Sequence, residues 1–454
     1  MIIKENLKKN PRYLAVYILS NLESKNTLLD SLINKNESII NQNQPKDKAL
    51  FFNIVYGVLR KRGNIDKIIK RNSNKPIEKI DLPVLNVLRT GIYQMVYLEK
   101  IPYSAAVNTS VDIVKTIGLK SASGFVNGIL RSFSKNFDKK KYFKYEKNTA
   151  DFPRWIIMRW KKRFGEKTTE KLCCFYNLAP PVTLRVNSVK TTKKEVTQML
   201  LSCTENICQD KFAKDALKIQ KPNTQIHNLP GFKKGFFQVQ DAGAQIVTTL
   251  LNPLQNEKIM DACAGLGGKT GYIAQLTRGK AFITAVDSNS SKLEILKNEM
   301  LRLGFSNCVK TAVTDLSKKT EIFQNGFFDK ILVDAPCSGL GVLRRNPDTK
   351  WKKKYKDLKE CTKIQKKILG NCAGLVKRGG YLLYTVCSFE KEETSEIIDN
   401  FLKENVNFKK VMPDTAIPAD FIDKNMDIIL FPHKSQTDGF FASLLKKEKN
   451  QKND

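Results

Sequence analysis

The chain has 454 residues, and its 78 Lys and Arg against 45 Asp and Glu give a formal net charge of +33. The longest apolar runs are far shorter than the ~20 residues that a membrane-spanning helix needs, which excludes an integral membrane protein of the helical kind. So large a positive charge indicates a polyanionic partner, and nucleic acid is the first candidate.

The cysteines argue for free thiols rather than for disulfides or a metal. Ten Cys are scattered along the chain without the paired spacing of a zinc site, and only two His accompany them. The N-terminal residues lack the apolar core of a signal peptide. We therefore expect a cytoplasmic protein that works as a monomer, holds no metal and keeps its cysteines reduced.

Residues 1–140 predict an all-helical domain. Leu85, Leu88 and Ile92 repeat at helical spacing after Asp81, which is a candidate N-cap. A second helix is expected to have Ser104 as its N-cap, and no alternation of strand type interrupts the region. Lys and Arg on the polar faces would give this domain a basic surface.

Residues 141–235 predict a linker followed by a small α+β module. The basic stretch 134–148 is typical of a linker, and the patterns that follow indicate a helix at 152–165, a strand at 180–187 and a helix at 193–202.

Residues 236–454 alternate between strands and helices. This alternation predicts a Rossmann-like α/β domain with a mostly parallel sheet and helices on both faces. Strands are expected within residues 258–265, 281–287, 307–315, 328–339 and 380–388, and helices within 291–304 and 366–380.

Three features at successive strand ends indicate an adenosine cofactor. The turn in "DACAGLGGKTG" is rich in glycine but fits neither the dinucleotide nor the Walker pattern. Asp287, about twenty residues later, is placed to bond ribose hydroxyls, and Asp315 ends the next strand, where it can accept a bond from an adenine amino group. Either acid alone would equally be a helix cap. Together they describe a cofactor without a pyrophosphate, so S-adenosylmethionine fits better than NAD.

Two thiols follow two other strands at the same edge. Cys337 ends "DAPC", which also contains Asp334, and Cys387 lies in "YTVCS". Each Cys alone would be read as a small buried residue. Beside a methyl donor, the pair indicates methylation of cytosine at carbon 5, because that carbon becomes nucleophilic only after a thiolate adds to carbon 6. A carboxyl group that bonds N3 and the exocyclic amine of the base would stabilise the adduct.

The motifs "DACAGLGGKT", "VDAPCSGLGVLRRNPDTKW" and "YTVCSFEKEE" resemble those of the RNA 5-methylcytosine methyltransferases of the Sun/RsmB (NOL1/NOP2/Sun) family. "GFFQVQDAGAQ", "LRVN" and "TDGFFAS" are similar to this family too, and "FVNGILR" resembles the NusB RNA-binding domain. The bacterial RsmB subgroup, which combines both parts, modifies small-subunit ribosomal RNA, so the resemblance implies 16S rRNA as the substrate. At the cofactor turn the chain has Gly265 and Leu266 where the family usually has Ala-Pro.

The resemblance also implies roles for individual residues. Cys387 would be the nucleophile, Cys337 would assist release of the methylated base, and Asp334 would contact the base near the cofactor. Asp287 would take the ribose and Asp315 the adenine edge. The methionine part of the cofactor would lie on the turn Cys263, Ala264, Gly265, Leu266, Gly267, Gly268 and Lys269.

Basic and acidic residues near these motifs leave alternatives open. Arg344, Arg345 and Lys350 suit RNA phosphates, or else form a solvated loop. Arg185 and Asn187 would contact RNA or pair within the protein. The acidic residues of 390–393 are expected to orient the following helix and so hold Cys387 in place. Two other functions also remain: the same chemistry on tRNA, and an RNA-binding or antitermination factor with a vestigial methyltransferase domain.

Overall fold

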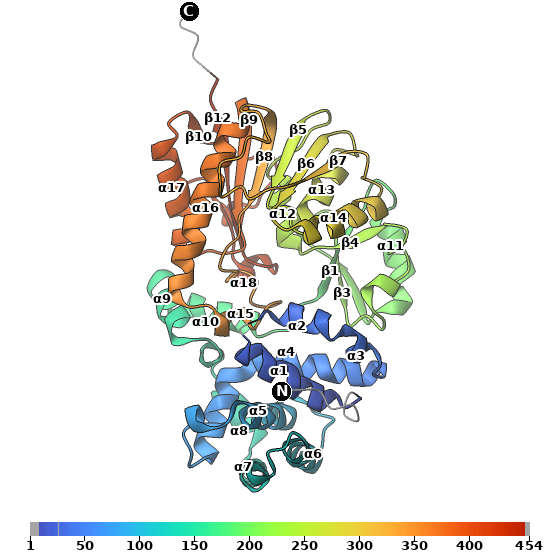
Figure 1. Ribbon diagram of the computed structural model, residues 1–454, viewed down its shortest axis with the longest axis vertical. Helices are drawn as coiled ribbons and strands as arrows, with labels where there is room; N and C mark the ends of the chain where they lie inside the picture. Colours follow the sequence, from blue (N-terminus) through green and yellow to red (C-terminus); the bar gives the residue numbers. More distant parts are fainter. Residues whose placement is uncertain (1–8, 26, 450–454) are drawn as a thin grey trace, which may run out of the picture. The chain divides into compact units, whose positions relative to one another are not determined.

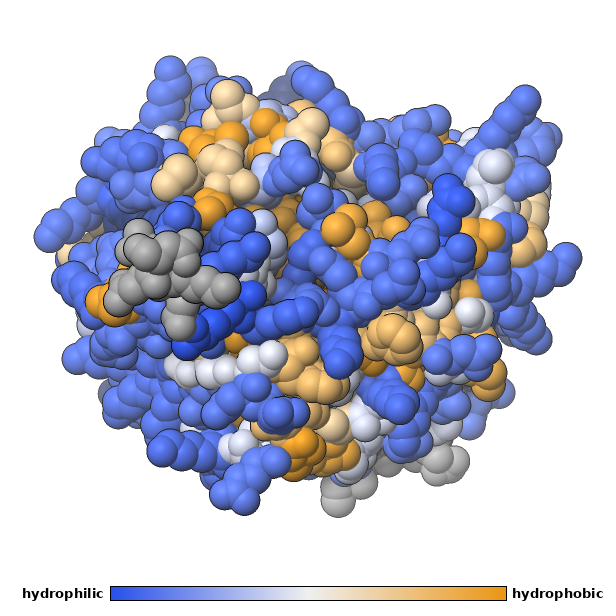
Figure 2. All heavy atoms as spheres, turned by 90° about the horizontal axis from the view of Figure 1, so that it is seen from above, coloured by the Kyte–Doolittle hydropathy of each residue, from blue (hydrophilic) through white to orange (hydrophobic). Residues whose placement is uncertain are grey.

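The computed structural model describes residues 9–25 and 27–449, and its contacts divide the chain into two compact units. Unit 1 contains the chain up to Ala179 together with residues 343–353, and unit 2 contains residues 180–342 and the chain from Lys354 onward. Both units are visible in the ribbon diagram (Figure 1). Hydrophilic side chains predominate on the face shown in Figure 2, with hydrophobic areas scattered among them. In the part of the chain that the structure describes, no helix has both the length and the apolarity needed to cross a bilayer.

Unit 1 is helical, as the sequence predicts for its N-terminal part. Asn10 caps the first helix, because its side chain accepts hydrogen bonds from the backbone N–H groups of Arg12 and Tyr13. The helices are α1 (Pro11–Ser24), α2 (Leu29–Lys35), α3 (Glu37–Asn41), α4 (Pro45–Asn72), α5 (Leu82–Tyr97), α6 (Tyr103–Thr116), α7 (Ser123–Asn136), α8 (Lys139–Tyr145), α9 (Arg154–Phe164) and α10 (Glu166–Tyr176), with α15 (Thr349–Lys352) from the later segment.

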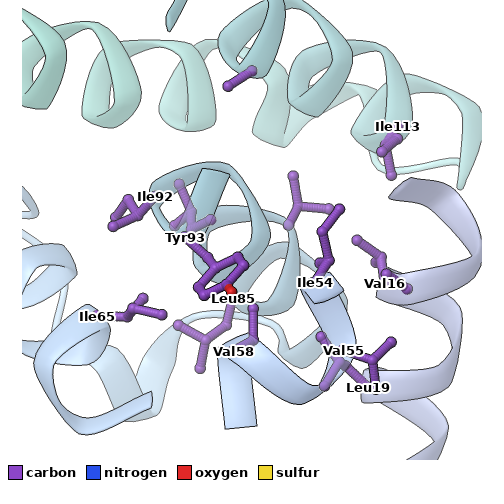
Figure 3. Close-up of a cluster of buried hydrophobic side chains, with 14 of the residues drawn as sticks. Val16, Leu19, Ile54, Val55, Val58, Ile65, Leu85, Ile92, Tyr93 and Ile113 are labelled. Carbon is purple, nitrogen blue, oxygen red and sulfur yellow. The ribbon is translucent and has the colours of Figure 1, made fainter. Parts of the chain in front are cut away.

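A hydrophobic core joins α1 to α7 (Figure 3). It is built from apolar residues at helical spacing, such as Ile54 and Val58 on α4 and Leu85 and Ile92 on α5, all of them buried. Tyr93 lies in the middle of this cluster, and its hydroxyl donates to Oδ1 of Asn53 at 2.7 Å. The helices therefore pack through the apolar faces that the sequence periodicity predicts.

Two local predictions in this unit are wrong. α6 begins at Tyr103 after Pro102, so Ser104 lies inside the helix rather than at its N-cap. The stretch expected to be a linker contains α8, and Tyr142 on that helix packs against the core and shares a 2.7 Å hydrogen bond with the hydroxyl of Tyr97. Aromatic residues among the lysines make this segment part of the unit.

Residues 343–353, which we call the anchor segment, belong to unit 1 although unit 2 contains both of their neighbours in sequence. The indole N–H of Trp351 donates to the carbonyl of Leu59 at 2.8 Å. Asp348 accepts from the backbone N–H of Leu29, 319 positions earlier. These bonds tie the segment that follows "DAPCSGLG" to the helices of unit 1.

Unit 2 contains a small antiparallel sheet and a large, mostly parallel one. The small sheet has the order β2-β3-β1-β4 and is built from β1 (Val182–Val186), β2 (Asn206–Gln209), β3 (Ala216–Gln220) and β4 (Phe237–Val239). Helix α11 (Lys193–Leu200) begins with a capping box between Thr192 and Glu195. The strand and the helix predicted after residue 180 are both present.

The large sheet has the order β10-β12-β9-β8-β5-β6-β7, with β11 paired to β12. Its strands are β5 (Lys258–Ala262), β6 (Phe282–Asp287), β7 (Val309–Val313), β8 (Phe328–Asp334), β9 (Val376–Val386), β10 (Phe408–Lys410), β11 (Ile428–Leu430) and β12 (Phe440–Lys447). The five strands β5 to β9 run parallel, and the C-terminal strands pair antiparallel at one edge.

Helices cover both faces of this sheet, which confirms the predicted Rossmann-like fold (Figure 1). One hydrophobic cluster packs alternate residues of the strands against α12 (Ala242–Thr249), α13 (Gly268–Leu276) and α14 (Ser290–Leu303). The other cluster packs the intervening residues against α16 (Tyr355–Leu375) and α17 (Ser395–Glu404). A further short helix is α18 (Pro432–Ser435). One boundary differs from the prediction: residues 376–380 belong to β9 rather than to the preceding helix.

Replacing Gly57 by Ala tests the core of unit 1. A Cβ at Gly57 would lie 2.0 Å from Cζ of the buried Tyr93 ring, so we expect a loss of about 1–3 kcal/mol in the free energy of unfolding. Gly128→Ala is the matched control, because a Cβ there meets nothing within 4 Å, and it should stabilise the helix by up to about 1 kcal/mol.

Tryptophan fluorescence during urea denaturation measures this effect, since Trp155, Trp160 and Trp351 all belong to unit 1. Equal unfolding midpoints for the two variants would contradict the packing described for α4 and α5.

Candidate active site

The carboxyl ends of five parallel strands meet at one edge of the large sheet. Asp287 ends β6, Asp334 ends β8, and Cys387 follows β9 directly. The pairing of β8 with β9 sets Asp334 beside Thr385, two residues before Cys387. Because parallel strands deliver their carboxyl ends to the same side, these residues are brought together from distant parts of the sequence.

The turn after β5 has the backbone conformation that its glycines permit. Gly265 and Gly267 have φ values of +57° and +85°, in the left-handed region that favours glycine. A Cβ at Gly267 would lie 2.7 Å from Cγ of Leu296, so this position also needs the missing side chain. Ala264 is buried, Leu266 is exposed, and α13 begins at Gly268.

A pocket of about 420 Å³ opens beside this turn. Its lining includes Cys263, Gly265, Asp287, Asp315 and Asp334, so the predicted carboxylates share one cavity. Ala264, Leu266, Gly267, Gly268 and Lys269, which are also predicted to bind the cofactor, are not among the residues that line it.

Neither carboxylate is the N-cap of an α-helix. Asp287 accepts hydrogen bonds from the backbone N–H groups of Gly265 (3.0 Å) and Asn289 (2.8 Å), and Asn289 is the residue that caps α14. Asp315 accepts from the hydroxyl and the backbone N–H of Ser317, and these bonds lower the pKa of its carboxyl group. Asp287 therefore holds the turn in shape, and the pKa shift favours the charged form of Asp315.

The thiols of Cys337 and Cys387 lie 3.1 Å apart, Sγ to Sγ. The pKa of Cys337 is raised well above its ordinary value by its hydrogen bond to Cys387, by burial, and by the charges of Cys387 and Glu393. Cys337 is therefore held as the protonated partner, and its S–H is placed to donate to the sulfur of Cys387.

Lys269 adds a positive charge beside the same sulfur. Its Nζ donates to Oδ2 of Asp334 at 2.5 Å, and its ammonium interacts electrostatically with Cys387. Burial alone would lower the pKa of Lys269, but the charge and hydrogen bond of Asp334, with the charges of Asp261 and Cys387, raise it above the ordinary value. Lys269 thus stays charged and interacts with both the Asp334 carboxylate and the Cys387 sulfur.

Arg185 lies behind the cofactor turn, where its burial contradicts direct contact with RNA. The side chain is 1% exposed and donates to Gln238 (2.6 Å), Gln240 (2.5 Å), Gln275 (3.1 Å) and the carbonyl of Gly268 (2.7 Å). Burial lowers its pKa to about 10. Arg185 therefore fixes the first residue of α13.

Asn187 is likewise buried, and its amide donates to the carbonyls of Gly235 and Leu303. Of the two readings left open for "LRVN", pairing within the protein is the one that the structure supports.

The other basic residues that were predicted to contact RNA phosphates lie in the anchor segment, and the structure contradicts this prediction for one of them. Lys350 is 1% exposed, with its Nζ 4.0 Å from the ring centroid of Phe152 and donating to the carbonyl of Arg60, so it does not reach RNA phosphates. Burial lowers its pKa to about 7. Arg344 stacks on Phe175 and donates to the carbonyl of Ala179. RNA contact by the half-buried Arg344 and Arg345 stays a prediction.

Glu393, one of the acidic residues expected to orient the following helix, bonds to a different element. Glu393 is fully buried and accepts from the backbone N–H and the hydroxyl of Ser338, next to Cys337. Thr394 rather than an acidic residue is the N-cap of α17. The Glu393 carboxylate therefore bonds to the loop that contains Cys337 and not to the N-terminus of α17.

Sequence reasoning missed the glutamines around Arg185 and the role of Glu393. Gln238 and Gln240 stand two residues apart in "FQVQ", a spacing that places both on one face of an extended chain, and this signal was available. No comparable signal connects Glu393 with Ser338, because 55 residues separate them.

The carboxyl edge of the sheet therefore combines a pocket large enough for a nucleoside with two thiols, an ammonium and a carboxylate. These groups can carry out nucleophilic attack on a substrate that is held beside the pocket.

Comparison with known proteins adds family information for each region. The family model "16S rRNA methyltransferase RsmB/F" matches residues 248–446, the NusB family model matches residues 9–135, and the RsmF/B-like ferredoxin-like domain matches residues 152–227.

Relatives match along nearly the whole chain. The probable ribosomal RNA small subunit methyltransferase B of Bacillus subtilis (strain 168) is 34% identical, over 97% of this chain and 99% of that protein. The ribosomal RNA small subunit methyltransferase B of Proteus mirabilis (strain HI4320) is 31% identical, over 97% and 99%. The crystal structure of PH0851 superimposes with a TM-score of 0.78 at 25% identity, covering 99% of this chain and 100% of that one.

Arg185→Lys separates the structural role of this residue from the predicted RNA contact. A lysine keeps the charge but cannot span four acceptors, so we expect a loss of about 2–4 kcal/mol in the free energy of unfolding of unit 2. Circular dichroism during urea denaturation measures it. Unchanged stability together with weaker RNA binding would show that the side chain serves RNA instead.

Proposed function

We propose that this chain, which belongs to the RsmB/F family of 16S rRNA methyltransferases, transfers a methyl group from S-adenosylmethionine to carbon 5 of a cytosine in 16S rRNA. The observation that carries the proposal is the 3.1 Å approach of Cys337 and Cys387 beside a nucleoside-sized pocket. A methyltransferase that acts on an exocyclic nitrogen has no use for two thiols, whereas carbon 5 of cytosine requires a nucleophile at carbon 6.

The pocket fits S-adenosylmethionine by the chemistry of its donors and acceptors. We assign Asp287 to the ribose hydroxyls and Asp315 to the adenine edge, and Cys263, Gly265 and Asp334 line the same pocket. The pocket needs no phosphate cradle, in keeping with a turn that lacks the Walker spacing. When bound, S-adenosylmethionine supplies an electrophilic methyl group.

Cys387 is the nucleophile in this proposal. Its sulfur lies 3.1 Å from that of Cys337 and interacts electrostatically with the Lys269 ammonium, and a nearby cation stabilises the negative charge of an attacking sulfur. The sulfur adds to carbon 6 of the cytosine, and electron density moves to carbon 5, which would then take the methyl group as its bond to the donor sulfur breaks and S-adenosylhomocysteine leaves. Asp334, held by Lys269, accepts a hydrogen bond from the exocyclic amine of the base and so keeps the ring in place.

Release of the product needs a second event at carbon 5. Transfer of the carbon-5 proton to a water molecule restores the double bond between carbons 5 and 6 and expels Cys387 as a thiolate. We assign assistance in this step to Cys337, because it lies against the sulfur that leaves.

Cys387→Ala should abolish methyl transfer by at least about 10³-fold, since the nucleophile acts as a unit with its partners. Bisulfite sequencing of 16S rRNA and tRNA, with and without the protein, reads methylation at carbon 5 and distinguishes the two substrates. Cys208→Ala, at an exposed cysteine on β2, is the matched control and should keep full activity. Turnover like that of the wild type in Cys387→Ala would contradict the nucleophile assignment.

Cys337→Ala should trap the enzyme on its RNA. Cys387 can still attack in this variant, but expulsion of the product is slowed, so a protein–RNA adduct should accumulate and survive a denaturing gel. The double variant Cys337→Ala/Cys387→Ala provides the control and should form no adduct. Absence of adduct in the single variant would overturn the release role.

A further inference from the structure

Glu393 is a buried carboxylate that the proposed reaction does not yet use. Its side chain is 0% exposed, and within the described residues no Lys or Arg forms an ion pair with it. Burying a charge without a cation is costly unless hydrogen bonds satisfy the carboxylate oxygens. Packing alone does not explain why a carboxylate is buried at this position.

The hydrogen bonds of Glu393 converge on the loop that contains Cys337. The backbone N–H of Ser338 donates to Oε1 at 2.7 Å, and the hydroxyl of Ser338 donates to Oε2 at 2.6 Å. Gln365 on α16 donates to Oε1 at 3.3 Å and to the carbonyl of Pro336 at 3.0 Å. Both neighbours of Cys337 are therefore held, Ser338 by Glu393 and Pro336 by Gln365.

Glu393 is also tied to the strand that ends in Cys387. The hydroxyl of Tyr384, on β9, donates to the backbone carbonyl of Glu393 at 2.8 Å. The two loops contact each other directly as well, because the backbone N–H of Gly341 donates to the carbonyl of Cys387 at 2.9 Å. One residue thus spans the strand of one thiol and the loop of the other.

We propose that Glu393 is a positioning residue that holds Cys337 against Cys387 for release of the methylated base. This inference rests on the proposed function. Only a group with two acceptor oxygens matches the two donors of Ser338, since a glutamine would turn its NH₂ toward one of them. The negative charge of Glu393 also favours the protonated form of Cys337.

The two thiols depend on Glu393 to different degrees. Val386, the residue before Cys387, is paired with Phe441 in the β9–β12 ladder, so the nucleophile keeps its support when the acid is removed. Cys337 lies in a loop instead, and the residues on either side of it are held by Glu393 and Gln365. Loss of Glu393 should therefore slow release while attack by Cys387 continues.

Glu393→Gln and Glu393→Ala in the full chain test this inference. We expect turnover to fall by about 10- to 100-fold, as for other residues that orient a reacting group, and a protein–RNA adduct to accumulate on a denaturing gel as with Cys337→Ala. Ser338→Ala, which removes only the hydroxyl, should give the same pattern more weakly. Glu396→Gln is the matched control: Glu396 pairs with Lys391 at the surface and should be replaceable without effect.

The adduct is the readout that a merely structural role would not change. Thermal unfolding and S-adenosylmethionine binding, measured on the same samples, show whether the fold survives. Loss of cofactor binding and adduct together, or turnover like that of the wild type without adduct, would overturn the inference. If Cys337→Ala traps adduct and neither Glu393 variant does, the inference fails and the proposed function stands; if Cys337→Ala traps none, the release role fails and this inference with it.

Discussion

Parallel pairing of β8 with β9 brings the two thiols together, and the site depends on it. The register places Asp334 beside Thr385, so Cys337, three residues after the first, and Cys387, two residues after the second, leave neighbouring strands at the same edge. The pairing β12–β9 extends the sheet on the far side and supports the strand that ends in Cys387. A shift of one residue in this register would turn every side chain of the strand to the opposite face.

The two thiols have neighbours of opposite charge. Lys269 interacts with Cys387, and Glu393 lies next to the loop of Cys337. The hydrogen bond to Cys387, burial and the charges of Cys387 and Glu393 raise the pKa of the Cys337 thiol and favour its protonated form, whereas the charged neighbour of Cys387 is an ammonium. In the proposed reaction Cys387 attacks the base and Cys337 assists release of the product. The different charges beside the two cysteines are consistent with these different roles.

Much of this could be predicted from the sequence, because local patterns report local structure. The strand ends that place Asp287, Asp334 and Cys387 are short apolar runs that stop at a polar residue, and the fold confirms each strand. The burial of Arg185 and Lys350 could not be predicted, since a buried basic residue and an exposed one look alike in a sequence. Only the tertiary structure shows that glutamines surround the first and that the helices of unit 1 enclose the second. Glu393 belongs to the same class, because its partner is 55 positions away.

The most direct test of the account is to identify the sulfur that bonds the RNA. An RNA with 5-fluorocytosine at the target position cannot lose a proton from carbon 5, so the adduct with the wild-type protein should persist. Peptide mapping by mass spectrometry should then find the nucleotide, with the transferred methyl group, on the peptide that contains Cys387. Attachment to Cys337, or no attachment to either cysteine, would contradict the account.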